Sequence, residues 1–128
     1  MFIVLDLETT GLSTKDDAII EIACVKIERR SFKEVARFTS FIHPEREIPD
    51  FIQTLTHIST KDIEDAPVFS EIRESLQEFL EGCPIIGHNI AFDVKFLQAA
   101  GIDISKNPAI DTFFLANFLC FQEKSLNL

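Results

Sequence analysis

Short apolar runs open the chain and are separated by polar turns. Residues 2–5 form the first run, residues 18–27 form a second run rich in Ile, and residues 35–42 alternate apolar and polar positions before Pro44. Alternation with a period of two and an abundance of β-branched residues are typical of strands. The pattern therefore predicts a buried strand followed by two strands that pair as a hairpin beside it.

Helical spacing replaces this pattern after Pro49. Apolar positions recur at helical spacing over residues 51–58, and a 3.6-residue period runs over residues 69–80, with Gly82 placed to cap the C-terminal end. The remaining chain predicts two short strands, each followed by a helix with a capping side chain at its start. These elements are strands at residues 84–87 and 108–110, a helix at residues 91–100 capped by Asn89, and a helix at residues 113–121 capped by Asp111.

The order of the predicted elements defines the fold class. Three strands, then helices, then strand, helix, strand and helix indicate an α/β protein with a mixed sheet and helices on its faces. With 128 residues, of which 46% are apolar, the chain supports one domain over residues 1–128. Residues from Ser125 onward have the pattern of a helix start, so we expect this domain to be truncated at its C-terminus.

Charge narrows the range of functions. The net charge of −9 argues against a free-standing protein that binds phosphate backbones tightly, because such affinity comes from clustered Lys and Arg. Chemistry on nucleic acid would then be local, with bound cations neutralising the site or a partner delivering the strand. No apolar run is long enough to span a bilayer, and the three scattered cysteines fit buried thiols in a reducing compartment. We therefore expect a soluble, cytoplasmic protein with no membrane partner.

Carboxylates stand at the ends of two predicted strands. Asp6 and Glu8 are two residues apart, so their side chains point the same way if the first strand continues through them. A cation such as Mg²⁺ or Mn²⁺ would relieve their repulsion. Alternatively, Glu8 is solvated and Asp6 caps the following turn, and spacing alone leaves both possibilities open. Asp93 follows the strand at residues 84–87 and would face Asp6 if the two strands are parallel neighbours, although taken alone it fits better as an acid at a helix N-terminus.

Two segments resemble known motifs. Residues 6–12, Asp-Leu-Glu-Thr-Thr-Gly-Leu, and residues 88–93, His-Asn-Ile-Ala-Phe-Asp, resemble the first and second motifs of the DEDD, or DnaQ-like, 3′-to-5′ exonucleases. Residues 48–49, 55–59 and 110–112 also resemble the branch that contains the epsilon proofreading subunit of bacterial DNA polymerase III. The resemblance covers the whole chain. It implies a ribonuclease H-like fold with a five-stranded mixed sheet and helices on both faces, here without its C-terminal helix.

The same resemblance implies a reaction. Asp6, Glu8 and Asp93 would hold two divalent cations, Mg²⁺ or Mn²⁺, and single-stranded nucleic acid, with DNA favoured over RNA, would be hydrolysed from its 3′ end to nucleoside 5′-monophosphates. A polymerase or helicase assembly would be the partner. Phe92 also fits a core position, and His57 stands where many members of the family have Gly. The implied substrate contacts are Thr9, Thr10, Gly11, Leu12, His57, Asn89 and Phe92.

The third motif of this family is absent from the chain. It supplies a fourth carboxylate and a His or Tyr, yet after Asp111 the only acid is Glu123, no His follows His88, and the chain has no Tyr. His88 itself is expected in a structural or substrate-side role. Because loss of a general base costs about 10² to 10⁴ in rate, we expect little or no nuclease activity from these 128 residues. Two alternatives stay open, a catalytically silent module that docks on a polymerase and a different two-metal phosphotransferase on the same fold.

Overall fold

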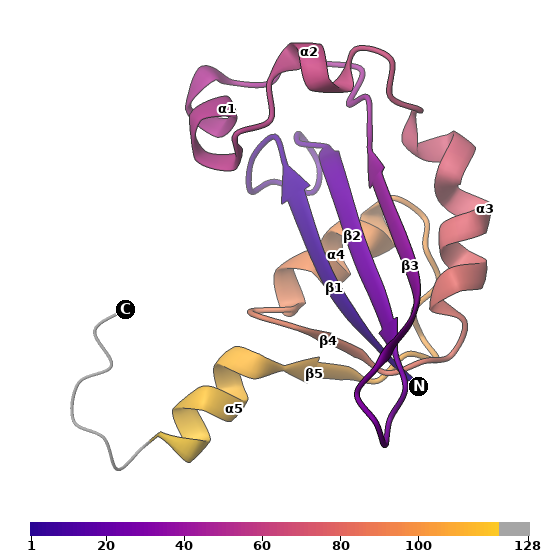
Figure 1. Ribbon diagram of the computed structural model, residues 1–128. Helices are drawn as coiled ribbons and strands as arrows, with labels where there is room; N and C mark the ends of the chain where they lie inside the picture. Colours follow the sequence, from indigo (N-terminus) through magenta and orange to yellow (C-terminus); the bar gives the residue numbers. More distant parts are fainter. Residues whose placement is uncertain (121–128) are drawn as a thin grey trace.

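A five-stranded mixed sheet forms the centre of the computed structural model, which describes residues 1–120. The strand order is β3-β2-β1-β4-β5; β1 and β3 lie antiparallel to β2, whereas β4 lies parallel to β1 and β5 parallel to β4 (Figure 1). The predicted hairpin and the predicted α/β fold class with five strands are confirmed. The strands are β1 (Phe2–Thr9), β2 (Ile19–Ile27), β3 (Glu34–Phe41), β4 (Ile85–Gly87) and β5 (Ala109–Asp111).

The helices follow the predicted order, with one division that the sequence did not indicate. The apolar segment predicted over residues 51–58 is two helices, because His57 takes a left-handed conformation with φ of 59° and ends the first. A capping box of Ser59 and Asp62 then starts the second. The predicted helix end at residue 121 and helix start at Ser125 lie outside the described residues. The helices are α1 (Asp50–Thr56), α2 (Thr60–Ile63), α3 (Phe69–Leu80), α4 (Ala91–Ala99) and α5 (Thr112–Leu119).

Alternation along β1 decides which face of the sheet is covered. Ile3, Leu5 and Leu7 are buried on one face, in a core that α3 and α4 complete with residues such as Leu97. A second apolar cluster joins Ile20 of β2 to α1 and α2, which lie across the end of the sheet (Figure 1). The opposite face of β1 carries the predicted carboxylate pair and is left accessible.

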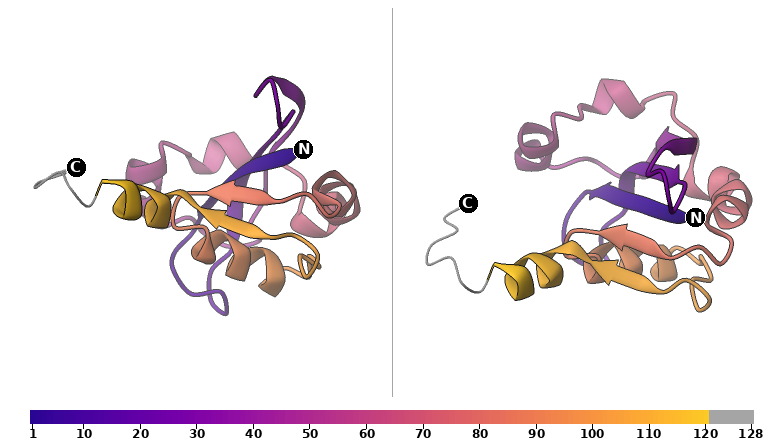
Figure 2. Two further views of the ribbon diagram at one scale, coloured as in Figure 1. Left: turned by 90° about the horizontal axis from the view of Figure 1, so that it is seen from below. Right: turned by 60° about the horizontal axis from the view of Figure 1, so that its bottom comes forward.

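The apolar helix α5 projects from one edge of the molecule (Figure 2). Its Phe114 and Phe118 are 75% and 81% exposed, and none of its residues is buried. The Asp111 carboxylate caps it by accepting a hydrogen bond from the Phe113 N–H, as predicted. No helix within residues 1–120 is long and apolar enough to cross a bilayer.

The prediction that Asn89 caps α4 is wrong. The N-cap residue is Ile90, and no side chain bonds to the helix start there. Asn89 instead has a φ of 56°, and its N–H donates to the Asp111 carboxylate at 3.0 Å. Asn tolerates left-handed backbone better than most residues, so its presence marks a sharp turn after β4. Asp111 thereby ties the end of β4 to the start of α5.

Candidate active site

Asp6 and Glu8 lie on the same face of β1, because the strand continues through both of them to Thr9. The same-face arrangement predicted for the pair is therefore confirmed. The register with β2 places Ala23 opposite Asp6 and Glu21 opposite Glu8. Asp6 is exposed and Glu8 is half-buried, so the pair sits at the edge between solvent and the core.

Asp93 reaches the same strand from the first turn of α4. Its side chain is only 5% exposed, and its Oδ1 accepts a hydrogen bond from the Leu7 N–H at 3.0 Å. This contact is possible because the pairing of β1 with β4 ends at Val4 and Ile86, which leaves the edge of β1 open to α4. β1 and β4 are parallel neighbours, so the arrangement that would bring Asp93 toward Asp6 is present.

Burial and mutual repulsion raise the pKa of three carboxyl groups around Asp6. Burial is the main cause that raises the pKa of Asp93 from 3.8 to about 6; the charges of Asp6 and Glu8 add to it, and backbone N–H donors oppose it. The pKa of Glu8 is raised mainly by burial, and the negative charges of Asp6 and Glu21 raise it further. The pKa of Glu21 is likewise raised mainly by burial, and the negative charge of Asp6 adds to this. Four carboxyl groups therefore share one electrostatic site.

Glu21 is the member of this site that the sequence analysis did not single out. It is the one acid in β2, within the apolar run Ile-Ile-Glu-Ile-Ala-Cys-Val, and that isolated charge was the available signal. Its partner could not be predicted from the sequence, because the register of β1 with β2, which places Glu21 opposite Glu8, depends on contacts between the two strands.

The carboxylates suit divalent cations by their chemistry. Oxygen ligands are those that hard cations such as Mg²⁺ prefer. Within residues 1–120 the one ion pair joins Glu34 and Arg37, so no Lys or Arg of this range neutralises the four acids. The His, Cys, Asp and Glu side chains of the same residues do not form a ready cluster of three ligands around one point. The donors therefore fit a cation, and side-chain rotation would have to accompany its binding.

A pocket of about 650 Å³ opens beside Glu8, between the end of β1 and α1. It is lined in part by Phe51 and Leu55 of α1, which are 66% and 73% exposed and which the sequence analysis did not single out. Their spacing of four residues on one helix face was the available signal. His57 and Asn89 are not among the described residues that line it. Five of the predicted substrate residues do line it, namely Thr9, Thr10, Gly11, Leu12 and Phe92.

Side chains of the turn after β1 shape the wall of this pocket. The Thr9 hydroxyl donates to the Gly11 carbonyl at 2.6 Å, and the Thr10 hydroxyl donates to the Asp17 carboxylate at 3.1 Å. The same carboxylate accepts a hydrogen bond from the Ser13 N–H at 2.9 Å. A Cβ atom at Gly11 would overlap the Asp17 carboxylate, so glycine suits this position. Both hydroxyl groups therefore donate hydrogen bonds that stabilise the turn.

The sequence pattern of the RNase_T exonuclease family matches residues 3–124. The chain belongs to this exonuclease family. The exonuclease chain is 37% identical over 130 residues to a DNA polymerase III PolC-type protein of Caldanaerobacter subterraneus, 36% over 119 residues to the DNA polymerase III subunit epsilon of Treponema pallidum, and 38% over 123 residues to the 3′-5′ exonuclease DinG of Bacillus subtilis. These matches cover 99%, 90% and 92% of the exonuclease chain but only 9%, 54% and 13% of the relatives. The chain therefore spans about half of the epsilon subunit and a far smaller part of the other two.

Solved structures of two exonucleases share the fold. Exonuclease X in complex with 5′ overhanging duplex DNA superposes with a TM-score of 0.73 at 24% identity, covering 93% of this chain and 64% of that one. A product-bound structure of exonuclease I superposes with a TM-score of 0.78 at 14% identity, covering 95% of this chain and 32% of that one. Together with the family match, these likenesses confirm the DnaQ-like family and the fold expected from the sequence.

Neither His57 nor His88 of the exonuclease chain joins the carboxylates. The Nδ1 atom of His88 lies 3.2 Å from the Thr112 hydroxyl, and its ring meets Phe113 edge-on, which agrees with a structural role. His57 ends α1 in the left-handed region, where glycine is the favoured residue. A glycine at this position would adopt the same conformation without strain.

Replacing His57 by Gly is expected to stabilise the exonuclease chain by up to about 1 kcal/mol, because the backbone strain of a left-handed non-glycine residue is removed. Urea unfolding measures the change. The matched control is His57→Ala, which removes the imidazole and keeps the strain. A Gly variant that is no more stable than the Ala variant would contradict the assignment of strain to this position.

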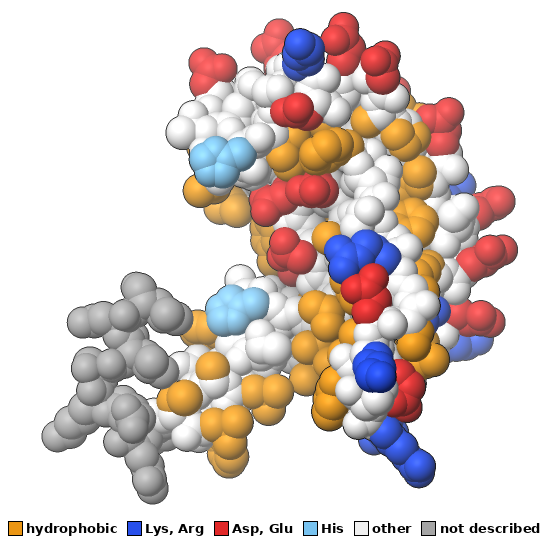
Figure 3. Space-filling model, viewed as in Figure 1, with side chains coloured by type: hydrophobic (Ala, Val, Ile, Leu, Met, Phe, Trp, Pro, Cys, Tyr) orange, Lys and Arg blue, Asp and Glu red, His pale blue; other side chains and the backbone are white. Residues whose placement is uncertain are grey.

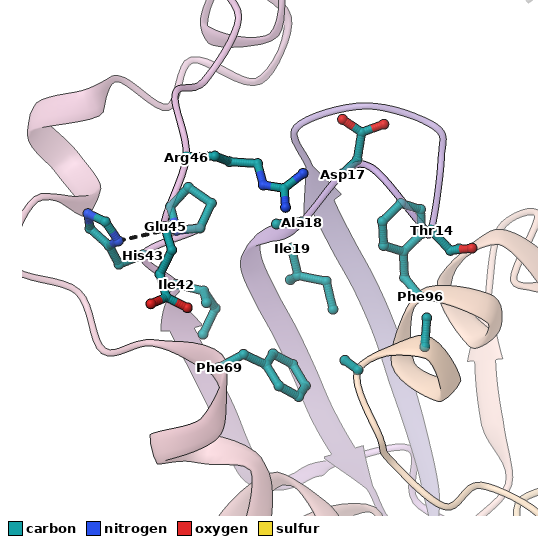
Figure 4. Close-up of a pocket in the computed structure, with 13 residues that line it drawn as sticks. Thr14, Asp17, Ala18, Ile19, Ile42, His43, Glu45, Arg46, Phe69 and Phe96 are labelled. Carbon is teal, nitrogen blue, oxygen red and sulfur yellow. Dashed lines mark hydrogen bonds between the residues drawn. The ribbon is translucent and has the colours of Figure 1, made fainter.

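A second hollow of about 430 Å³ lies beyond the same turn, between the loop at residues 43–46 and the helices α3 and α4 (Figure 4). Phe69 and Phe96 contribute apolar walls, and Arg46 borders it. The Glu45 N–H donates to His43 Nδ1 at 3.1 Å at its rim. None of the predicted site residues lines this hollow.

Proposed function

We propose that this exonuclease-family chain supplies Asp6, Glu8 and Asp93 to a protein that, as encoded by its complete reading frame, removes nucleotides from the 3′ ends of single-stranded DNA. The 128 residues by themselves lack the fourth carboxylate and the general base, so little or no hydrolysis is expected from them alone. The observation that carries the proposal is the position of Glu8. It shares an electrostatic site with Asp6 and Asp93, and it also lines the pocket formed by the turn after β1 and by α1. A terminal nucleotide needs both features, an apolar pocket for its base and an adjacent site for the charge of its phosphate.

Two divalent cations, Mg²⁺ or Mn²⁺, are the proposed cofactors, held by Asp6, Glu8 and Asp93. When bound, such cations activate water and stabilise the leaving 3′ oxygen. The protein contributes the positions of the ligands: β1 fixes Asp6 and Glu8 on one face, and the Leu7 N–H orients the Asp93 carboxylate. Glu21 is proposed to add negative charge beside Glu8. The products would be nucleoside 5′-monophosphates.

A polymerase assembly is the proposed partner. Its support is that two relatives at 36% and 37% identity are named as DNA polymerase III proteins. The exposed apolar side chains of α5 are compatible with contacts to further protein. The alternative function, a silent module that binds without cutting, would use the same partner and differ only in the absence of hydrolysis.

Digestion of a 5′-labelled single-stranded oligonucleotide tests the proposed function. The protein is expressed with everything its natural reading frame encodes, and the reaction contains Mg²⁺ or Mn²⁺. The expected result is stepwise shortening from the 3′ end with release of nucleoside 5′-monophosphates, and no shortening in EDTA. Internal cuts, or intact oligonucleotide with both cations, would contradict the proposal, and intact oligonucleotide that still binds would favour the silent module.

Phe51→Ala is expected to weaken binding of the terminal nucleotide about 5- to 150-fold, because stacking of a base on an aromatic ring contributes roughly 1 to 3 kcal/mol. The melting temperature should change little, since the ring is 66% exposed. Fluorescence anisotropy of a 5′-labelled oligonucleotide measures the affinity. Phe114→Ala is the matched control, because this ring is similarly exposed and lies on α5, outside the pocket. Equal effects of the two variants would show that Phe51 does not contact the substrate.

A further inference from the structure

The positive charge of the chain is concentrated in the β2–β3 hairpin. Residues 26–37 hold five Lys and Arg against two Glu, a formal charge of +3, so the other residues carry −12 of the total of −9. In Figure 3, Lys and Arg side chains gather at the lower end of the hairpin, whereas acidic side chains dominate the upper elements and the side of α3. Positive and negative charge are therefore separated within the chain: the hairpin is positive, although the chain as a whole is negative.

The two acids of the hairpin form no ion pair with the cations Arg29, Arg30 and Lys33 at its tip. The Glu28 carboxylate accepts hydrogen bonds from the N–H groups of Arg30 and Ser31 at 3.0 and 2.6 Å, so it is used to close the turn. Glu34 forms an ion pair with Arg37 at 2.7 Å. The exposed side chains of Arg29, Arg30 and Lys33 make no ion pair within residues 1–120.

An exposed aromatic ring stands among these cations. Phe32 is 71% exposed, and its φ of 55° is a conformation that bulky residues rarely adopt. The turn holds it there, because its N–H donates to the Glu28 carbonyl and the Glu28 N–H donates to the Lys33 carbonyl. The guanidinium of Arg29 lies 5.6 Å from the centre of the Phe2 ring, which anchors it to the sheet. The tip thus presents one ring and three cations on a closed turn.

We propose that the hairpin tip, formed by Arg29, Arg30, Phe32 and Lys33, is a second binding site for single-stranded nucleic acid. Phosphates pair with the three cations, and a base stacks on Phe32, which is the combination that binds single strands without sequence preference. The proposal rests on the proposed function for the identity of the substrate. An acidic peptide would use the cations but has no base to place on the ring.

The position of the tip gives the second site a role. It lies at the opposite end of β1 from Glu8 and Thr9 (Figure 1), and seven residue steps along a strand span roughly 23 Å. An acidic body repels a polyanion, so a positive tip is where a strand would first be held. The tip therefore retains the part of the strand several nucleotides away from the end that is cut.

Binding of a fluorescent 20-nucleotide oligothymidylate in EDTA tests this inference. The triple variant Arg29→Gln, Arg30→Gln, Lys33→Gln is expected to bind about 10-fold more weakly, with the slope of log affinity against log salt reduced by about 2. Phe32→Ala should weaken binding about 5-fold with little change in that slope. The control triple variant Arg73→Gln, Lys95→Gln, Lys106→Gln removes the same charge from exposed sites outside the hairpin and should leave affinity and slope near those of the wild type.

Three outcomes would overturn the inference: no measurable binding by the wild type, equal losses in the two triple variants, or an oligoglutamate that displaces the oligonucleotide at equal charge concentration.

A dinucleotide is too short to reach the tip. The protein of the complete reading frame should therefore hydrolyse a dinucleotide equally well with the wild-type and the variant hairpin. Mn²⁺ should also stabilise the wild type and the hairpin variant equally. Absence of dinucleotide hydrolysis in both would contradict the proposed function and leave the binding result at the hairpin intact.

Discussion

Asp6→Asn is expected to lower the exonuclease rate by about 10³-fold or more and to abolish stabilisation by Mn²⁺. Asp6 is the one carboxylate whose charge raises the pKa of Asp93, Glu8 and Glu21 together, so it is the electrostatic centre of the site. A cation held there supplies several kcal/mol of charge stabilisation in hydrolysis of a phosphodiester, and about 4 kcal/mol corresponds to three orders of magnitude in rate. In the wild type, Mn²⁺ at 100 times its dissociation constant should stabilise the fold by about 2.7 kcal/mol.

The two effects are measured separately, by oligonucleotide digestion and by thermal unfolding with and without Mn²⁺. Asp16→Asn is the matched control, because Asp16 is an exposed acid in the turn after β1 that belongs to neither the carboxylate site nor the pocket beside Glu8. Without metal, Asp6→Asn should be at least as stable as the wild type, since repulsion is reduced. Retained stabilisation by Mn²⁺ in Asp6→Asn would show that the cation binds elsewhere.

Asp93→Asn is expected to raise the stability of the metal-free protein at pH 8 by up to about 3 kcal/mol. Burial raises the pKa of Asp93 from 3.8 to about 6, a difference of roughly two units, and each unit corresponds to about 1.4 kcal/mol. Since the folded state binds the proton more tightly than the unfolded state, this group makes the protein less stable as the pH rises from about 4 to 6. Asn keeps an oxygen that can accept the Leu7 N–H and carries no charge.

The difference in unfolding free energy between wild type and Asp93→Asn, measured from pH 3.5 to 8 in EDTA, isolates this contribution because other acids titrate in both proteins. The difference should be smallest below pH 4, grow to pH 6 and stay constant above pH 7. Mn²⁺ should reverse it at pH 8 by stabilising only the wild type. A difference that does not change with pH would mean that the Asp93 carboxylate is not held in a repulsive, buried environment.

Most of the fold could be predicted because it is encoded in local periodicity. The apolar, β-branched run at residues 2–5 predicted the first strand as a buried one. The structure extends it through Asp6 and Glu8 to Thr9 and buries only alternate residues, such as Ile3, Leu5 and Leu7. The helix predicted over residues 69–80 has the same bounds in α3. Motif resemblance then identified the family before any contact was known.

The parts that could not be predicted depend on contacts between distant segments. Glu21 faces Glu8 only through the register of β1 with β2, which runs unbroken from the pair Phe2 and Ile27 to the pair Glu8 and Glu21. The helix predicted over residues 51–58 divides at His57, which takes a left-handed conformation that the apolar spacing of the segment did not indicate. The prediction for Asn89 failed because a capping residue and a turn residue share the same chemistry, and the Asp111 carboxylate decides between them from 22 residues away.

Titration with Mn²⁺ tests whether Asp6, Glu8 and Asp93 form a cation site, because it depends on neither substrate nor partner. Calorimetry on the wild type, Asp6→Asn and Asp16→Asn at pH 8 measures the affinity for the cation. We expect saturable binding that is at least about 10-fold weaker in Asp6→Asn and unchanged in Asp16→Asn. Equal affinity of Asp6→Asn and the wild type, or no saturable binding by the wild type, would contradict the proposed cation site.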